Sequence, residues 1–385
     1  MQTSLKGAVV VALSTGAVQA GGIERTPQSP LLLYETGNVL EVSLAYASPQ
    51  LTGKNQSPPF PAQDFDNAGR DFYLPSFALK YDLTETWALG VIYERPFGAD
   101  VAYGDENVVL GGTTAQASTH ALTALLKYQI NDNFSAFGGL RLQQASGRIH
   151  LEGLAYGAVS GYTVDLDKAT GTGYVAGVAY EIPDIALRVV LTYSSAITHD
   201  METRESGPAI PVDVTGDGVP DVSLPLLDGS GSTEVKTPTS WTLDFQTGIM
   251  ADTLLFGSVR YLKHREFRVD PDSFVLVTGD GLIDLDDTTA YTLGIGRRFN
   301  DRISGAISAT FEAPTDILVS PLAPTSGYTQ LRLAGAYKAS ERVTLSGAVS
   351  HFWLGDGKPQ TAQTARANFS DNRAWGIGLK LSYHF

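Results

Sequence analysis

Apolar and polar residues alternate over short segments along most of the chain, most clearly at its end. From Trp375 to Phe385 every second residue is apolar, and the residues between are glycine, lysine, serine or histidine. A period of two predicts a strand with one apolar and one polar face. A tilted strand of about ten residues is long enough to cross a bilayer.

Fourteen segments of this kind follow one another along the chain. Their residues are 39–46, 73–81, 87–93, 122–128, 134–142, 174–180, 185–193, 241–249, 255–261, 291–299, 303–311, 331–337, 343–349 and 375–385. Bacterial outer-membrane barrels have an even number of strands. The predicted fold class is therefore all-β, a transmembrane antiparallel β-barrel of about 14 strands. The C-terminal strand resembles that of such barrels, and we expect the barrel assembly machinery to recognise it through Phe385.

The connections between these segments alternate between short and long. Six short turns lie near residues 83–85, 131–133, 183–184, 251–252, 300–301 and 340–341, and seven long loops cover residues 47–72, 96–118, 145–171, 198–238, 266–288, 313–328 and 354–372. All short turns then lie at one end of the barrel. Short periplasmic turns and long extracellular loops are typical of outer-membrane barrels, whereas a Greek-key sandwich gives no reason for this order.

Aromatic residues support the same orientation, because nine of them lie on the outward face at the short-turn end. Such a girdle is typical of the membrane interface, and we expect membrane lipid around it. The nine are Tyr81, Trp87, Tyr128, Phe134, Tyr180, Phe299, Tyr337, Tyr383 and Phe385.

Three domains follow from the N-terminal sequence. Residues 1–20 have the charged, apolar and small-residue order of a secretory signal peptide. Residues 21–37 contain two prolines and the apolar run Leu31, Leu32 and Leu33, and precede the barrel of residues 38–385. Because a fourteen-stranded barrel is wide enough to leave a lumen, residues 21–37 are the candidate plug, anchored by Ile23 and the leucine run. The alternative is a disordered periplasmic tail.

Composition narrows the function. The 40 glycines, the 17 tyrosines and the absence of cysteine fit an exported all-β protein with many turns. A net charge of −14 argues against a nucleic-acid partner, and no feature calls for a cofactor. The register facing the lumen is nonetheless mostly basic, which either stiffens the barrel through ion pairs or binds an anionic head group. Its arginines are Arg141, Arg188, Arg260 and Arg332.

Catalytic patterns are missing from the sequence. Six histidines are scattered without metal-ligand spacing, and no serine lies in a GxSxG motif. We therefore expect a protein that is not an enzyme. A lipid-modifying enzyme using Ser118 and His120, which share one register, is kept as an alternative.

One segment of the longest loop resembles part of a calcium-binding loop. Asp213, Thr215, Asp217 and Asp221 supply oxygens at positions 1, 3, 5 and 9, and Gly218 occupies position 6. Position 12 is Leu224 instead of an acidic residue. Calcium is therefore a candidate partner, against the alternative of an ordinary Asp-Gly turn.

Several features together resemble the FadL family of outer-membrane transporters for long-chain fatty acids and other hydrophobic compounds. They are the alternation of seven long loops with six short turns, a segment before the first strand, the break ERPFGAD at residues 94–100, and the stretch DRISGAISATFEAP at residues 301–314. The segment before the barrel is shorter than the family's usual hatch and lacks its Asn-Pro-Ala stretch.

This resemblance implies a plugged barrel with an opening in the wall near the third strand. Pro96 and Gly98 match the wall interruption, because proline removes a ladder donor and glycine permits a bulge. Tyr93, Phe97 and Tyr103 would be apolar neighbours of this gap. The alternative is that the strand ends at Arg95 and a loop begins.

The main hypothesis is therefore outer-membrane transport of hydrophobic, fatty-acid-like molecules through a plugged barrel, with lateral exit near the third strand. The alternative is a porin for polar solutes, which the basic lumen and the short plug would permit. An adhesive barrel that acts through its acidic loops is a third class.

Overall fold

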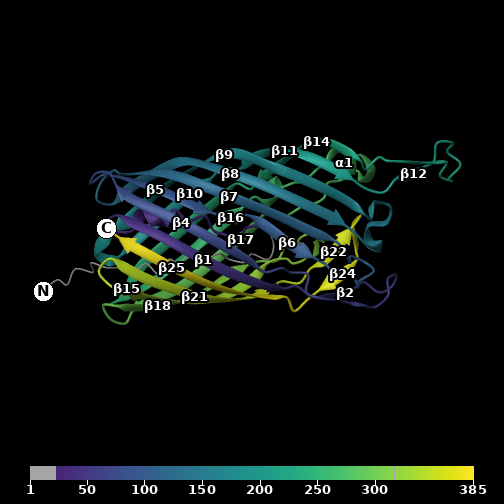
Figure 1. The fold of residues 1–385 in the computed structure, drawn as a ribbon. Helices are drawn as coiled ribbons and strands as arrows, with labels where there is room; N and C mark the ends of the chain where they lie inside the picture. The colour runs from purple at the N-terminus through teal and green to yellow at the C-terminus, as the bar shows by residue number, and fades with distance from the viewer. Residues whose placement is uncertain (1–22, 316) are drawn as a thin grey trace.

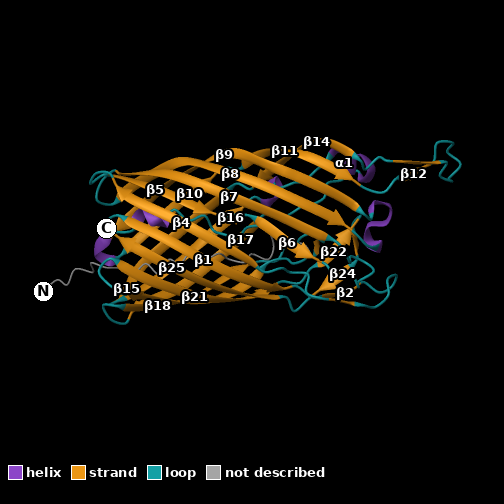
Figure 2. Ribbon diagram, in the orientation of Figure 1, coloured by secondary structure: helices purple, strands orange, loops and turns teal. Residues whose placement is uncertain are grey.

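The computed structural model shows one closed antiparallel β-barrel for residues 23–315 and 317–385, the residues it describes (Figures 1 and 2). The signal peptide predicted for residues 1–20 lies outside the described residues. No helix in the described part of the chain is long and apolar enough to cross a membrane.

Each of the fourteen predicted segments lies in one strand of the barrel, and three of these strands are broken in two. The strands are β1 (Val39–Gln50), β4 (Phe72–Asp82), β5 (Trp87–Glu94) with β6 (Gly98–Ala102), β7 (Thr114–Gln129), β8 (Phe134–Leu151), β9 (Tyr162–Ile182), β10 (Leu187–Ser194) with β11 (Ile197–Ser206), β14 (Gly229–Thr237) with β15 (Ser240–Met250), β16 (Thr253–Leu262), β17 (Thr288–Arg298), β18 (Ile303–Glu312), β20 (Tyr328–Lys338), β21 (Val343–Leu354) and β25 (Arg373–His384). The predicted fold class is confirmed.

The barrel closes where its last strand meets its first. Strands β1 and β25 pair without interruption, from Val39 opposite His384 to Gln50 opposite Arg373. On the inner face of this seam, Lys380 Nζ donates a hydrogen bond to Glu41 Oε1 at 2.7 Å, and the Ser382 hydroxyl donates to the same oxygen at 2.8 Å. The predicted inward direction of Lys380 and its ion pair with Glu41 are confirmed.

Two belts of aromatic residues flank an outward apolar band. At the short-turn end, seven of the nine predicted girdle residues are exposed, and Tyr180 and Tyr383 pack against Phe134 and Phe385. The second belt lies at the loop end and contains the contacting pairs Tyr46–Tyr73, Tyr174–Tyr193, Tyr193–Trp241 and His351–Trp375. An apolar band between two aromatic girdles is the outer surface that a bilayer requires of a barrel.

The strands are longer at the loop end than the alternation predicts. Most of the loop expected at residues 145–171 belongs to β8 and β9, which pair as far as Leu151 opposite Tyr162. The outward side chains there are charged, as in the ion pair of Arg148 with Asp165. Since this part of the wall faces water rather than lipid, the apolar half of the period-two pattern disappears although the strands continue.

The long loops pack into a cap of their own (Figure 1). In it, Tyr103 is 2% exposed, packs against Phe65 and Phe369, and donates a hydrogen bond to the Pro321 carbonyl at 2.6 Å. Tyr103 therefore lies in the loop core instead of beside the wall gap. The elements outside the barrel wall are β2 (Gly53–Asn55), β3 (Asp64–Phe65), β12 (Ile210–Val212), β13 (Val222–Leu224), β19 (Leu318–Val319), β22 (Lys358–Thr361), β23 (Thr364–Ala365), β24 (Ala367–Phe369), α1 (Asp272–Thr278) and the 3₁₀ turns η1 (Leu31–Tyr34), η2 (Leu154–Val159), η3 (Pro183–Ile185) and η4 (His264–Glu266).

Candidate functional site

The segment from Ile23 to Gly37, here called the N-terminal segment, lies inside the barrel. Its apolar anchor is Leu33, which is fully buried among inward residues of the wall. A Cβ on Gly90 of β5 would lie 2.7 Å from the Leu33 side chain, so only glycine leaves room for this leucine. Leu32 is buried in the same apolar cluster and Leu31 packs against it, and both also line a polar pocket.

Polar contacts fix the same segment to three sides of the lumen. The Arg260 guanidinium of β16 donates hydrogen bonds to the Glu24 carboxylate. The Thr26 hydroxyl donates to Glu94 of β5 at 2.5 Å, and Arg141 of β8 donates to the Gln28 side-chain oxygen. Two of the four predicted lumenal arginines therefore hold the N-terminal segment.

The other two predicted arginines differ from each other. Arg188 forms an ion pair with Glu181 at 2.7 Å and also donates a hydrogen bond to the Tyr34 carbonyl. Arg332 lies on β20, where within the described residues its Nε and Nη2 atoms are buried without a hydrogen-bond partner. Arg188 and Arg260 therefore form ion pairs and Arg141 bonds to a neutral side chain, whereas two nitrogens of Arg332 have no partner among the described residues.

The barrel wall has a break between β4 and the third strand. Strand β5 ends at Glu94 and β6 begins at Gly98, and β6 pairs only with β7. On the other side, β4 pairs with β5 up to the Phe77–Tyr93 pair. The next bridge is between Gly69 and Val101. Since the Arg70 amide also donates to the Asp100 carbonyl at 3.2 Å, the ladder is open between residues 71–76 and residues 94–99, and the strand resumes after the break instead of ending at Arg95.

The N-terminal segment lies against this break from the inside. The Arg25 amide donates to the Pro96 carbonyl at 2.6 Å, and the Gly98 amide donates to the Ile23 carbonyl at 2.8 Å. These bonds satisfy backbone groups that the missing strand partner leaves free, as a buried backbone requires. The Arg25 guanidinium lies 3.6 Å over the Phe72 ring of β4 and so bridges the two sides of the break.

An apolar cavity lies above the N-terminal segment, toward the loops. It has about 680 Å³ of empty space, which includes the part open to solvent. Among the described residues, no charged side chain lines it. The lining residues are Ile23, Phe97, Gly98, Ala99, Ala115, Gln116, Ala117, Ser118, Thr119, Ala145, Ser146, Gly147, Ile149, Leu166, Met201, Val235, Thr237, Phe267, Val269, Ile283 and Leu322.

The loops above this cavity are held by one buried carboxylate. Glu205 of β11 accepts hydrogen bonds from the Ser273 and Phe274 amides at 3.0 and 2.9 Å and from the Tyr162 hydroxyl at 2.7 Å. The Phe274 ring of α1 packs on Tyr162 with centroids 4.8 Å apart. The helix and the loop residues that cover the cavity are thus attached to the barrel wall.

A smaller pocket of about 290 Å³, here called the gap pocket, occupies the break in the wall. It shares Phe97, Gly98 and Ala99 with the apolar cavity, and its other side is formed by Phe72 and Tyr73 of β4. Phe97 is 4% exposed and lies between the two spaces. The cavity therefore borders the wall break.

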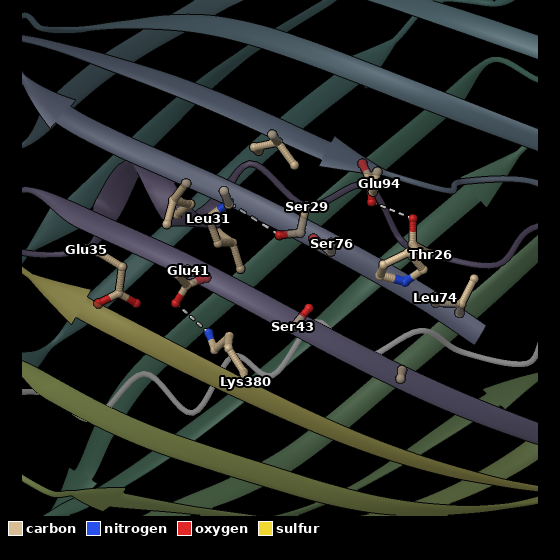
Figure 3. Close-up of a pocket in the computed structure, with 15 residues that line it drawn as sticks. Thr26, Ser29, Leu31, Glu35, Glu41, Ser43, Leu74, Ser76, Glu94 and Lys380 are labelled. Atoms are coloured by element: carbon tan, nitrogen blue, oxygen red, sulfur yellow. Dashed lines mark hydrogen bonds and ion pairs between the residues drawn. The ribbon is translucent and has the colours of Figure 1, made fainter.

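A third space lies on the other side of the N-terminal segment, and Figure 3 shows the residues around it. Its empty space is about 830 Å³, including open solvent. Glu35, Glu41, Glu94 and Lys380 line it together with several serines, and the Lys380–Glu41 pair lies on its wall. This lower pocket is charged where the upper cavity is not.

The remaining predicted site residues have other roles in the structure. The Tyr93 hydroxyl and His120 Nδ1 are 2.8 Å apart on the outer face of the wall. The Ser118 hydroxyl lies 3.5 Å from that of Ser146. His120 is thus bonded to a tyrosine and Ser118 to another serine, which gives no support to the Ser–His alternative.

The calcium hypothesis also finds no support in the geometry. Asp213 accepts hydrogen bonds from the Gly216 and Gly218 amides, and Asp221 accepts them from the Val214 and Thr215 amides. These bonds depress the pKa of both carboxyl groups, the Gly218 amide contributing most for Asp213. Thr215 and Asp217 lie in the same exposed turn. Among the described residues, no group of three or more acidic or histidine side chains is arranged to hold a metal ion.

Sequence reasoning missed most of the residues that line the cavity. Phe267, Val269 and Ile283 belong to a loop that reads as acidic, but they are at most 9% exposed. Arg268 neutralises the acids beside them through ion pairs with Asp270 and Asp280. The apolar residues between those charges could have indicated a buried loop, since an ordinary surface loop is mostly polar.

Comparison with known proteins gives a family and a fold. Residues 2–385 match the family described as "Outer membrane protein transport protein (OMPP1/FadL/TodX)". A FadL homologue of Pseudomonas aeruginosa is 15% identical, with a TM-score of 0.69 and 92% of each chain covered. The toluene transporter TodX of Pseudomonas putida is 12% identical, with a TM-score of 0.65 and 97% of each chain covered. The toluene transporter TbuX of Ralstonia pickettii is also 12% identical, with a TM-score of 0.60 and coverage of 91% of this chain and 90% of that one. A search of curated proteins finds no match.

Proposed function

Because the chain belongs to the OMPP1/FadL/TodX family of outer membrane transport proteins, we propose from its cavity that the compounds it carries are uncharged. The protein is a bacterial outer-membrane β-barrel that transports hydrophobic compounds and is not an enzyme. The family resemblance inferred from the sequence is therefore confirmed. The proposal concerns the charge of the transported compound.

The observation that carries the proposal is the lining of the apolar cavity. Leu166, Met201 and Phe267 offer only van der Waals contacts, and the polar side chains present are Gln, Ser and Thr. Burying apolar ligand surface there is favourable by about 25 cal/mol per Å². An isolated carboxylate would cost several kcal/mol, because no cation in the lining compensates it.

A fatty-acid-like ligand, as expected from the sequence, would therefore have to enter this cavity as the neutral acid. None of the four lumenal arginines lines this cavity, and Arg260 and Arg188 are already paired with Glu24 and Glu181. Two of the related structures are of toluene transporters. A small neutral hydrocarbon fits the same chemical requirement.

We place the exit at the break in the wall and assign the plug role to the N-terminal segment. The apolar cavity and the gap pocket share Phe97, whereas the route downward leads into the charged lower pocket. Arg25, Arg95 and Asp100 line part of the gap pocket, so the sideways route is favoured by its end in lipid, which stabilises an apolar compound, and not by an uncharged lining. The exit lies at the level of Tyr73, in the aromatic belt of the loop end.

The test compares ligands that differ by one carboxylate. Protein reconstituted in liposomes is loaded with an apolar fluorescent dye, and displacement by toluene is compared with displacement by benzoate at pH 7. Dodecanol and dodecanoate form a second pair with a longer chain. We expect the neutral member of each pair to displace the dye at least about tenfold more effectively, from the cost of burying a charge. Equal displacement by dodecanoate would favour fatty acid transport and contradict the proposal.

A further inference from the structure

Three arginine side chains converge on the break in the barrel wall. Arg25 comes from the N-terminal segment, Arg70 precedes β4, and Arg95 lies between β5 and β6. Arg25 and Arg95 line the gap pocket, and the charge of nearby Asp100 interacts with those of all three guanidinium groups. Three elements that are distant in sequence thus place cations around one small pocket.

None of these arginines forms an ion pair within residues 23–315 and 317–385. The side chain of Arg25 donates to the Gly98 carbonyl at 3.1 Å, and that of Arg95 donates to the Tyr73 carbonyl at 3.2 Å. Asp71, beside Arg70, accepts a hydrogen bond from the Tyr46 hydroxyl instead. Arg25, Arg70 and Arg95 outnumber the neighbouring carboxylates Asp71 and Asp100, so the formal charge around the pocket is about +1, in a chain whose net charge is −14.

An excess of guanidinium groups at a partly buried pocket is a site for an oxyanion. Arginine binds phosphate through two parallel hydrogen bonds, and its planar fork is already arranged for this geometry. Unpaired cations in a partly buried place are costly, so a bound anion would stabilise the protein there. The empty space of the pocket is about 290 Å³ including the part open to solvent, which is enough for a phosphate group but not for a whole lipid.

The surroundings point to a lipid as the source of the anion. Tyr73, which lines the pocket, belongs to the aromatic belt of the loop end, where lipid head groups meet the hydrocarbon core. Below it, Phe77 and Leu122 are 39% and 46% exposed on the outer face and provide an apolar surface for acyl chains. The apolar cavity behind it offers no charged partner to an anion arriving from the lumen.

We propose that the gap pocket binds the phosphate group of an outer-leaflet lipid through Arg25, Arg70 and Arg95. The lipid's acyl chains lie along the outward face of β4 and β7, and its head group occupies the break that the N-terminal segment covers from the inside. The site adjoins the apolar cavity, with which it shares Phe97, Gly98 and Ala99, but Arg25 and Arg95 line the gap pocket alone.

The experiment measures lipid binding to the full mature barrel by native mass spectrometry. Phosphatidic acid, which carries a phosphate monoester, is titrated onto the detergent-solubilised protein, and diacylglycerol with the same acyl chains is the neutral control. We expect phosphatidic acid to bind and diacylglycerol to bind at least about tenfold more weakly, since hydrogen bonds to charged groups contribute about 1.5–3 kcal/mol. The double variant Arg70→Gln/Arg95→Gln should lose roughly tenfold or more in affinity for phosphatidic acid.

The matched control is Arg148→Gln, which removes an exposed arginine at the same end of the barrel that is paired with Asp165. Its affinity should equal that of the unchanged protein, and circular dichroism confirms that each variant keeps its β structure. Equal loss in Arg148→Gln and in the double variant would mean general surface attraction and overturn the proposal. Competition by dodecanoate at the affinity of phosphatidic acid would assign the pocket to a ligand carboxylate and overturn the lipid assignment.

Discussion

The two spaces on either side of the N-terminal segment differ in chemistry although the same barrel encloses both. The apolar cavity near the loops has no charged residue among its described lining, whereas the lower pocket contains three glutamates and a lysine. Inward strand residues form part of both walls, but loop residues such as Phe267 complete the upper cavity and residues of the N-terminal segment such as Glu35 complete the lower pocket. The difference therefore comes from the side chains at each level and from the segments that close each space.

The N-terminal segment lies between the apolar cavity and the lower pocket. A hydrophobic compound in the upper cavity meets charges below and lipid to the side, through the break beside Phe97. Water and ions in the lower pocket meet a segment attached by Glu24 and Thr26 to opposite walls. One short stretch of chain thus keeps a polar compartment apart from an apolar one.

The strongest way to break this separation is to release the segment. Glu24→Gln leaves Arg260 buried without its carboxylate, and breaking a buried ion pair costs about 3–5 kcal/mol. We expect the segment to loosen and sugars to pass, which liposome swelling measures. The matched control is Glu234→Gln, which breaks an exposed ion pair with Lys236. Liposomes that contain this variant should not swell. Restoration of a closed lumen in the double variant Glu24→Met/Arg260→Met would show that the unpaired buried charge of Arg260, and not the loss of the ion pair itself, loosens the segment.

A second prediction tests the two spaces with the same substitution. Ala145 lines the apolar cavity and Ala45 lines the lower pocket, and both are nearly buried. Ala145→Asp should reduce toluene uptake by at least about tenfold, because it places an uncompensated charge on the route. Ala45→Asp adds its charge to a polar lining and should leave uptake within about twofold. Equal effects of the two variants on uptake would mean that the route passes through both spaces.

A third prediction concerns the cap over the apolar cavity and its dependence on pH. Burial, helped by the charge of Arg260 and opposed by that of Asp287, lowers the pKa of His264 to about 4. Since the unfolded loop has its ordinary pKa near 6.5, the folded loop binds fewer protons between these values. The cap should therefore be fully stable above pH 6.5 and lose on the order of 1–2 kcal/mol at pH 5.

Hydrogen-exchange protection of residues 264–288 measures this loss. His264→Gln should remove the pH dependence, and protection that does not change between pH 7 and pH 5 in the unchanged protein would contradict the prediction. The described lining of the lower pocket contains no histidine. The backbone amides of the adjacent β1–β25 seam should therefore keep their protection from hydrogen exchange between pH 7 and pH 5.

The smallest expected effect is on stability, at the seam between β1 and β25. Lys380→Gln keeps a hydrogen-bond donor near Glu41 but removes the cation, so about 1 kcal/mol of stability should be lost. The measurement is the temperature at which the barrel unfolds on a denaturing gel. Toluene uptake should stay unchanged, because the apolar cavity does not touch this pair. A loss of uptake without a loss of stability would place the route in the lower pocket.

The sequence predicts the barrel well because lipid enforces a strict alternation. Every outward residue of Trp375–Phe385 has to be apolar, and the inward Lys380 could be placed from this register alone. The alternation fails above the membrane, where Arg148 and Asp165 face water on strands that continue. There the sequence predicts loops and the structure has strands.

The cavity was much harder to predict than the barrel. Its lining combines inward residues such as Ala145 and Met201, which are ordinary in a strand, with loop residues such as Phe267 from distant positions. No local pattern brings these together, because loop packing depends on tertiary contacts such as that of Glu205 with the start of α1. The break at Pro96 had a local signal, but the approach of Arg25 to it had none.

The pairing of residues 23–26 with residues 96–98 also sets an order of events in assembly. These residues lie inside a ring whose final seam joins β1 to β25, next to the point where the segment enters the wall at Val39. A ring that closed first would have to admit the segment lengthwise through its narrow end. While the seam is open, the segment can swing into place from the side and serve as a template for the third strand. The first residues of the segment would then be positioned before the last strand of the chain is joined.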